Sequence, residues 1–178
     1  MMQSPEHEHV VDFLVQHNSS FAEAGVVLTK TVGGIEPELT VVVATVVEDA
    51  LIVPQPRFAP PVAAVVLDPK GEIIALARDL GDRAIVNRHG PDVEFFEWRP
   101  ETFPGEGHQA SLGFRCVFGR ASGMAGTVNV VDTTGQELDS CAVSRDVFVL
   151  TFIPFGEAPT LEVRTPRGDL LGSMRIAR

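Results

Sequence analysis

Three short turns of one design divide the apolar runs of this chain into paired segments. Within Thr127–Val143, Asp132 opens the turn and Gly135 closes it. An Asp in the first turn position accepts hydrogen bonds from backbone N–H groups of its own turn, and a Gly in the fourth position adopts a positive φ without a steric clash. The same arrangement recurs in Val66–Ile74 and in Val163–Leu171, where Pro follows the first turn residue. Each segment predicts a β-hairpin with a type I turn and a Gly bulge, and together they predict an antiparallel β protein.

The runs between the turns indicate how the strands are buried. Leu39–Val47 and Val147–Ile153 carry apolar residues at both odd and even positions, which is typical of strands covered on two faces. Gln109–Phe118 alternates and predicts a half-buried strand. The Pro-rich run from Pro54 to Pro61 lacks the N–H groups that a sheet interior needs, so it predicts a crossing between sheets, with a mobile linker as the alternative. About ten short strands result, and they favour an all-β sandwich of two packed sheets over a barrel.

A helical pattern occupies the N-terminal 24 residues. Ser4 and Pro5 suit the start of a helix, and apolar side chains then recur at helical spacing at Val10, Phe13 and Leu14. This apolar stripe must lie either on a sheet face of the same chain or on a partner, and Phe13 is therefore a candidate partner-binding residue. We expect a helical segment over residues 1–24 and a β-sandwich domain over residues 25–178.

Charge and composition limit the classes of partner. The chain has 178 residues, 44% of them hydrophobic, and a formal net charge of −10. Such an acidic chain is unsuited to a nucleic-acid backbone or an anionic membrane surface, and no apolar run is long enough to span a bilayer. The N-terminus lacks the features of a signal peptide, so we expect a cytoplasmic protein. Cys116 and Cys141 fall in predicted strands as reduced, buried thiols, with a cross-strand disulfide as the alternative.

The segment Asn87–His108 is the main candidate for a functional region, because it is loop-rich and carries His, acidic and aromatic residues. His89 and His108 are weak candidates for metal ligands, since their spacing matches no compact ligand motif. In a strand, Phe96 and Trp98 lie on one face, so an exposed pair would suit a protein interface or a stacking platform for a sugar. The alternative is that both faces of this strand are covered by the core.

No pattern of residues predicts a catalytic centre. The stretch from Ala121 to Gly126 comes nearest to a nucleophile elbow, but it lacks the Gly two residues before the Ser. We therefore expect a non-catalytic interaction or assembly protein without a cofactor, which binds a protein partner or forms a homo-oligomer. The alternative is a small-ligand-binding protein or a metal-dependent enzyme with its site under the Asn87–His108 loop.

The C-terminal part of the chain resembles a known kind of β module. Its pattern consists of the run Gly126–Gly135 and the closing turn Thr165–Asp169. On these residues, the segment Gly126–Ile176 is similar to immunoglobulin-like or transthyretin-like modules appended to larger bacterial proteins. The resemblance covers under a third of the chain. It implies a sandwich-like fold and a binding role, and it assigns no functional residue.

Overall fold

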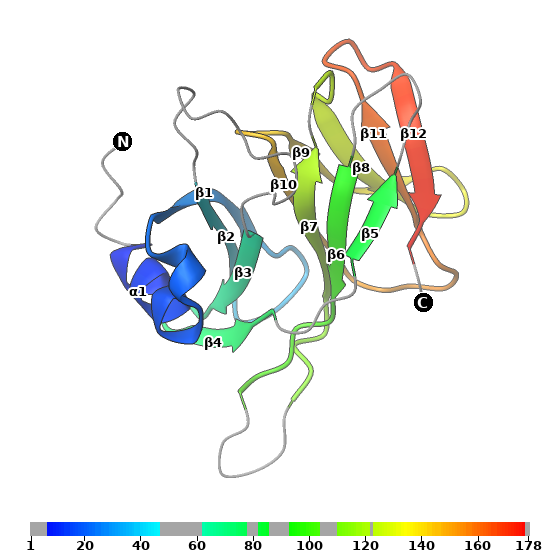
Figure 1. Ribbon diagram of the computed structural model, residues 1–178. Coiled ribbons are helices and arrows are strands. Elements are labelled where there is room, and N and C mark those ends of the chain that lie inside the picture. Colours follow the sequence, from blue (N-terminus) through cyan, green and yellow to red (C-terminus); the bar gives the residue numbers. More distant parts are fainter. Residues whose placement is uncertain are drawn as a thin grey trace.

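The fold consists of antiparallel β-sheets with a short helix at one side (Figure 1). The computed structural model describes residues 7–46, 62–77, 93–103, 110–121 and 123–176, and the backbone alone of residues 82–85. These ranges contain one α-helix, one 3-10 turn and twelve β-strands in three four-stranded sheets. The prediction of an all-β, antiparallel sandwich with one short N-terminal helix is confirmed. The Pro-rich run predicted to cross between sheets lies outside the described residues.

The first sheet is a simple antiparallel meander. Its strands pair in chain order, and a short helix with a following 3-10 turn precedes them. The elements are α1 (Glu8–His17), η2 (Ser19–Phe21), β1 (Ala24–Thr31), β2 (Thr40–Val46), β3 (Val62–Leu67) and β4 (Ile73–Leu76).

The other two sheets share the rest of the chain. The central sheet has the order β10-β7-β6-β5, and the third sheet has the order β12-β11-β8-β9. The central strands are β5 (Asp82–Ile85), β6 (Val93–Trp98), β7 (Arg115–Ala121) and β10 (Val147–Phe152). The third sheet contains β8 (Thr127–Val131), β9 (Glu137–Ala142), β11 (Thr160–Arg164) and β12 (Leu170–Arg175).

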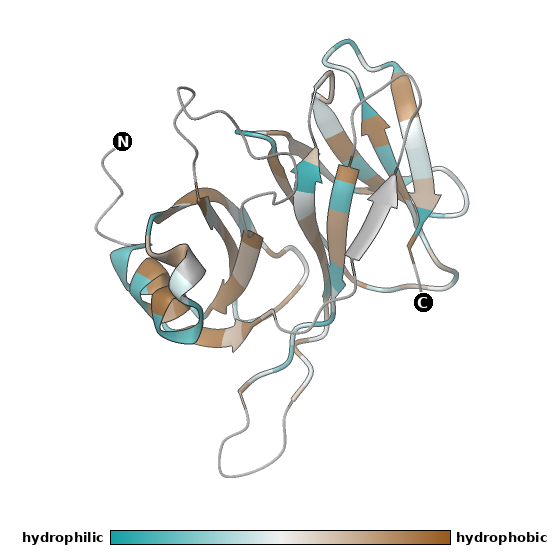
Figure 2. Ribbon diagram, viewed as in Figure 1, coloured by the Kyte–Doolittle hydropathy of each residue, from teal (hydrophilic) through white to brown (hydrophobic). Residues whose placement is uncertain are grey.

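The central sheet is covered on both faces, which makes the molecule four layers deep: α1, the first sheet, the central sheet and the third sheet. On β10, Val147 and Val149 pack in the core shared with the first sheet, whereas Phe148 and Leu150 pack in the core shared with the third. Figure 2 shows that apolar residues are concentrated in the strands and in α1. The sequence predicted two packed sheets, and the structure has a third because a strand with two apolar faces needs a cover on each side.

Helix α1 lies on the outer face of the first sheet. Val10 and Leu14 are buried against this sheet in a cluster that includes Val42 and Val65. The ring Nε2 of His9 lies 2.9 Å from the carbonyl oxygen of Gly71, at the turn between β3 and β4. The apolar stripe of the helix therefore packs within its own chain. The predicted helix start at residues 4 and 5 lies outside the described residues.

The three predicted turns have the expected geometry. Between β8 and β9, Asp132 Oδ1 accepts hydrogen bonds from the backbone N–H groups of Thr134 at 2.8 Å and Gln136 at 2.9 Å, and Gly135 has a φ of 86°. Gly71 and Gly168 have φ values of 82° and 94° in the turns β3–β4 and β11–β12. The strand register shifts beside each turn, as a Gly bulge requires. All three hairpins are confirmed.

Two further expectations differ from the structure. Strand β7 begins at Arg115, later than predicted, and Arg115, Cys116, Val117 and Phe118 are all buried because β7 is an inner strand of the central sheet. The segment that resembles a separate β module is not self-contained. Its strand β10 belongs to the central sheet, whereas its other strands form the third sheet.

Candidate functional site

Two of the aromatic residues of β6, Phe96 and Trp98, face the core between the first and central sheets. Trp98 is only 6% exposed and packs edge-on against Phe118, with ring centroids 6.3 Å apart. Phe96 is half-buried, and its ring centroid lies 5.3 Å from that of Phe118. Phe95 is fully buried on the opposite face of the strand, as the alternation predicts. Trp98 thus offers a partner little surface, and the partner-binding role of the half-buried Phe96 stays a prediction.

Of the remaining predicted site residues, only Phe13 lies within the described part of the chain. Phe13 is half-buried on α1, with its ring 4.3 Å from that of His17 and 5.8 Å from that of Phe103. His89 and His108 lie outside the described residues. Within the described ranges, no three His, Cys, Asp or Glu side chains gather in a group that could hold a metal ion.

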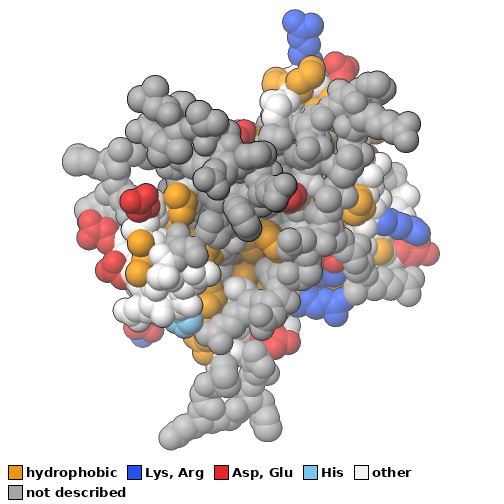
Figure 3. Space-filling model, viewed as in Figure 1, with side chains coloured by type: hydrophobic (Ala, Val, Ile, Leu, Met, Phe, Trp, Pro, Cys, Tyr) orange, Lys and Arg blue, Asp and Glu red, His pale blue; other side chains and the backbone are white. Residues whose placement is uncertain are grey.

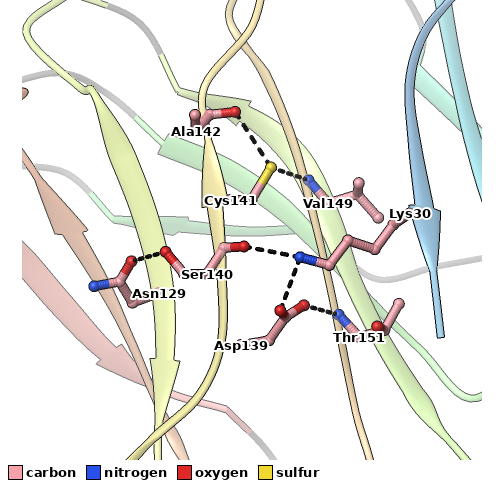
Figure 4. Close-up of polar contacts among 8 residues, drawn as sticks. All are labelled: Lys30, Asn129, Asp139, Ser140, Cys141, Ala142, Val149 and Thr151. Carbon is pink, nitrogen blue, oxygen red and sulfur yellow. Dashed lines mark hydrogen bonds and ion pairs between the residues drawn. The ribbon is translucent and has the colours of Figure 1, made fainter. Parts of the chain in front are cut away.

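A partly buried cluster of polar side chains joins all three sheets (Figure 4). Lys30 of β1 forms an ion pair with Asp139 of β9, with Nζ and Oδ1 2.8 Å apart, and also donates to the backbone oxygen of Ser140 at 2.8 Å. The second carboxylate oxygen of Asp139 accepts the N–H of Thr151 of β10 at 2.9 Å. The Ser140 hydroxyl donates to Asn129 Oδ1 at 2.8 Å. We call Lys30, Asp139 and Thr151 the inter-sheet joint, and its contacts are those of a structural element.

The two cysteines are free thiols, as the sequence predicted, but only Cys116 is buried, whereas Cys141 is half-buried. Burial raises the pKa of Cys141, and the N–H of Val149 and the charge of Lys30 only partly offset this effect. Burial raises the pKa of Cys116 far more strongly. Since the thiolate is the nucleophilic form, neither cysteine has the environment of an activated nucleophile.

An open cleft lies where the end of β6, residues 111–115 and the loop between β10 and β11 meet. Its volume is about 440 Å³, and Arg99, Arg115, Phe155 and Glu157 are among its lining residues. The loop, residues 153–159, is drawn in orange in Figure 1 and links β10 to β11 near the C-terminus. The cleft is a candidate functional site within the described residues.

The loop at this cleft exposes apolar side chains. Phe155 is 91% exposed and Ile153 is 46% exposed. The backbone of the loop is anchored at its far end, where the N–H of Ile176 donates to the carbonyl oxygen of Pro159 at 2.9 Å. Burial of a Phe from water stabilises a contact by roughly 1.5–3 kcal/mol, so an almost fully exposed Phe is an unused source of binding energy.

The charges in the cleft contrast with those of the whole chain. Arg115 is only 7% exposed, and its guanidinium lies 5.9 Å from the centroid of the Phe152 ring, a cation–π arrangement. Arg99 is exposed. Glu157 lies 3.9 Å from Arg175 and is largely solvated. The described lining of the cleft therefore contains two Arg and one Glu, in a chain of net charge −10. Acidic side chains are scattered over the face viewed in Figure 3, several of them around α1.

The sequence carries one local signal for this site, which lies outside the motifs described above. Phe155 stands between Pro154 and Gly156, directly after the apolar run of β10. A Pro–Phe–Gly sequence suits a turn better than a strand, so its Phe has no strand face through which to enter the core. Arg99 and Arg115 gave no such signal, because an Arg beside a strand is usually a solvated residue.

No protein-family model matches the chain, and comparisons with curated proteins and with solved structures give no significant match. No helix in the described part of the chain has both the length and the apolar character to cross a membrane. The function is therefore inferred from the geometry of the site.

Proposed function

We propose that this chain is a non-catalytic protein that acts by binding another protein, as a subunit or adaptor, with Phe155 as the central anchor of the contact. The observation that carries the proposal is the 91% exposure of this side chain on a loop beside an open cleft. Aromatic residues dominate the binding energy of many protein interfaces, and a ring with two rotatable bonds loses little entropy when it is fixed.

The surroundings of Phe155 support an interface. Ile153 adds a second exposed apolar side chain on the same loop, and its Cδ1 packs next to Gly34 of the β1–β2 turn. The anchored end of the loop at Pro159 limits the conformational entropy that binding would cost. A preformed apolar anchor flanked by charged side chains matches the usual pattern of an apolar centre and a polar rim.

A small ligand is the second candidate. The cleft volume of about 440 Å³ falls in the range of small-molecule sites, and its lining combines apolar surface with two Arg. Phe155 argues for the protein partner, because a ligand confined to the cleft would leave much of this side chain in water.

Site-specific photo-crosslinking tests the proposal. The photoreactive residue p-benzoylphenylalanine replaces Phe155 in one variant and Met124, which is 61% exposed and not part of the cleft, in a matched control. In the cells that naturally make the protein, we expect a discrete crosslinked product from position 155 and none from position 124. Mass spectrometry then identifies the product as another protein or a second copy of this chain. Absence of a discrete product at position 155 would refute the proposal.

A stability control accompanies this test. Because Phe155 is almost fully exposed, we expect Phe155→Ala to change the free energy of unfolding by less than about 0.5 kcal/mol. A larger loss would mean that Phe155 serves the fold and that its exposure does not mark an interface.

A further inference from the structure

We propose that the partner bound at Phe155 is a second copy of this chain, in a two-fold contact in which each Phe155 ring packs into the cleft of the other copy. The inference rests on the proposed function and adds the identity of the partner and the arrangement of the contact. Each copy contributes an aromatic anchor to the site of the other, so neither site is complete alone.

The cleft and the loop beside it form one self-complementary patch. A two-fold contact joins the same surface of both copies, so this surface must carry a projection and a depression side by side. Phe155 is the projection, with 91% of its surface exposed, and the cleft of about 440 Å³ is the depression. Because Phe155 also lines the cleft, the incoming ring of the second copy packs against the ring of the first.

The lining of the cleft suits an aromatic side chain. The buried Phe114 forms part of the wall, and Pro154, Ala158 and Pro159 add further apolar surface. Pro154 and Pro159 have no N–H group to donate to an incoming strand. The contact is therefore made by side chains and not by the addition of a β-strand along the loop.

The exposed charges of the cleft are opposite in sign and flank it. Arg99 follows β6 and Glu157 lies in the loop after β10, and β7 separates these two strands in the central sheet. The contact of Glu157 with Arg175 is long, at 3.9 Å, and solvated, so it contributes little. Arg115 does not enter this balance, because it is only 7% exposed and is engaged within its own chain.

A two-fold rotation pairs these charges across the contact. It exchanges the two flanks of the cleft, so Arg99 of each copy faces Glu157 of the other, and the contact gains two attractive pairs. A patch with one charge of each sign favours neither an acidic nor a basic partner, but it matches its own copy. A basic partner would find more acidic groups elsewhere, such as those around α1 (Figure 3).

Sedimentation equilibrium of the purified chain tests the inference. Self-association is measured from about 1 to 300 µM in about 0.1 M salt, a range that covers the affinity of a small interface. The variants are Phe155→Ala, Arg99→Glu and Glu157→Arg, and the last two are also measured as an equimolar mixture. Arg167→Glu is the matched control for Arg99→Glu, because Arg167 is an exposed Arg in the β11–β12 turn and does not line the cleft. All four positions are exposed, so these substitutions leave the fold intact.

We expect the wild type to form a dimer with a dissociation constant of about 1–100 µM. Phe155→Ala should weaken the dimer about a hundredfold, because two rings are lost per dimer and each contributes about tenfold. Arg99→Glu and Glu157→Arg should each weaken it about tenfold, because each change turns two attractive pairs into repulsive ones. Arg167→Glu should stay within about threefold of the wild type.

The mixture of the two charge variants is the most specific measurement. In a dimer of one Arg99→Glu copy and one Glu157→Arg copy, both pairs across the contact again have opposite signs. The mixture should therefore dimerise within about threefold of the wild type, although neither variant does so alone. Net charge predicts a different result, since Glu157→Arg brings this acidic chain closer to neutral and would by itself tighten the association.

The other outcomes overturn the inference, and the crosslinking experiment shows whether the proposed function fails with it. The two-fold contact is excluded by a chain that stays monomeric, by a dimer that Phe155→Ala leaves intact, or by a mixture that dimerises no better than its components. Assemblies that keep growing with concentration show a head-to-tail contact instead. If crosslinking at position 155 then yields a different protein, the proposed function stands and the identity of the partner is wrong. If crosslinking yields no discrete product, the proposed function fails as well.

Discussion

Removal of the Lys30 charge tests whether the inter-sheet joint holds the three sheets together. In Lys30→Met the apolar stem of the side chain is retained, but Asp139 loses its ion pair and keeps only the N–H of Thr151. The side chains of Lys30 and Asp139 are 24% and 18% exposed, so the pair lies between the solvated and the buried limits.

The magnitude follows from these two limits. Solvated pairs contribute about 0.2–1 kcal/mol, whereas breaking a fully buried pair by removing one partner costs about 3–5 kcal/mol. For the observed burial we expect Lys30→Met to lower the free energy of unfolding by about 2 kcal/mol. Asp139→Asn should cost about 1–2 kcal/mol, and the double variant should cost about 1 kcal/mol less than the sum of the two, since the second change removes an already unpaired group.

Equilibrium unfolding in urea measures these values, provided that the slope with denaturant is the same in all variants. Lys70→Met is the matched control, because Lys70 is the only other lysine and is exposed at the β3–β4 turn. It should cost less than about 0.5 kcal/mol. The reasoning is refuted if Lys30→Met costs no more than Lys70→Met, or if the effects at positions 30 and 139 simply add.

Two further predictions concern a strand and a turn. In Gly119→Ala the new Cβ would overlap the carbonyl oxygen of Glu94 and lie 2.7 Å from the Cα of Phe95, so we expect the free energy of unfolding in urea to fall by about 3 kcal/mol or more. Gly33→Ala is the control, because no atom lies within 4 Å of its new Cβ, and it should cost less than about 1 kcal/mol. Equal costs would contradict the close approach of β6 and β7. The hydroxyl of Thr134 lowers the pKa of Asp132, and the backbone N–H groups of the turn lower it further. The ionised Asp132 carboxylate therefore stabilises the fold fully at pH values above its ordinary pKa of 3.8, and this stabilisation is lost as the pH falls through the lower folded-state pKa. The difference in melting temperature between wild type and Asp132→Ala should therefore shrink between pH 6 and pH 2.5, and a difference that grows toward low pH would disprove the assignment.

The sequence predicted the local parts of the fold well, because short-range chemistry determines them. The Asp132 turn is encoded within a few residues by one acceptor side chain and one Gly, and its hydrogen bonds form as expected. The alternation that separates Phe95 from Trp98 is likewise a property of a single strand. By contrast, what covers each face depends on segments far apart in the chain. The two apolar faces of β10 were evident from the sequence, but the identity of the covering sheets was not.

The candidate site was harder to predict for the same reason. Arg99 and Arg115 lie at the same cleft only because β6 and β7 are paired, and the loop with Phe155 reaches them only because β10 lies beside β7. Among these residues, only Phe155 carried a local signal. Strand alternation predicts that Trp98 shares a face with Phe96 but leaves open whether this face is exposed or covered, and no feature of β6 alone could show that Phe118 covers Trp98.

The path of the chain between the central and third sheets makes these two sheets dependent on one another. After β7 the chain leaves the central sheet to form β8 and β9, returns to it as β10, and leaves again for β11 and β12. A fragment that ended before β10 would lack an edge of one sheet and half of the other, and an isolated piece that began at β8 would carry a strand without its neighbour. No single break in the chain therefore separates the two sheets into complete halves. Fusion partners are best attached before β5 or after β12, where they interrupt neither sheet.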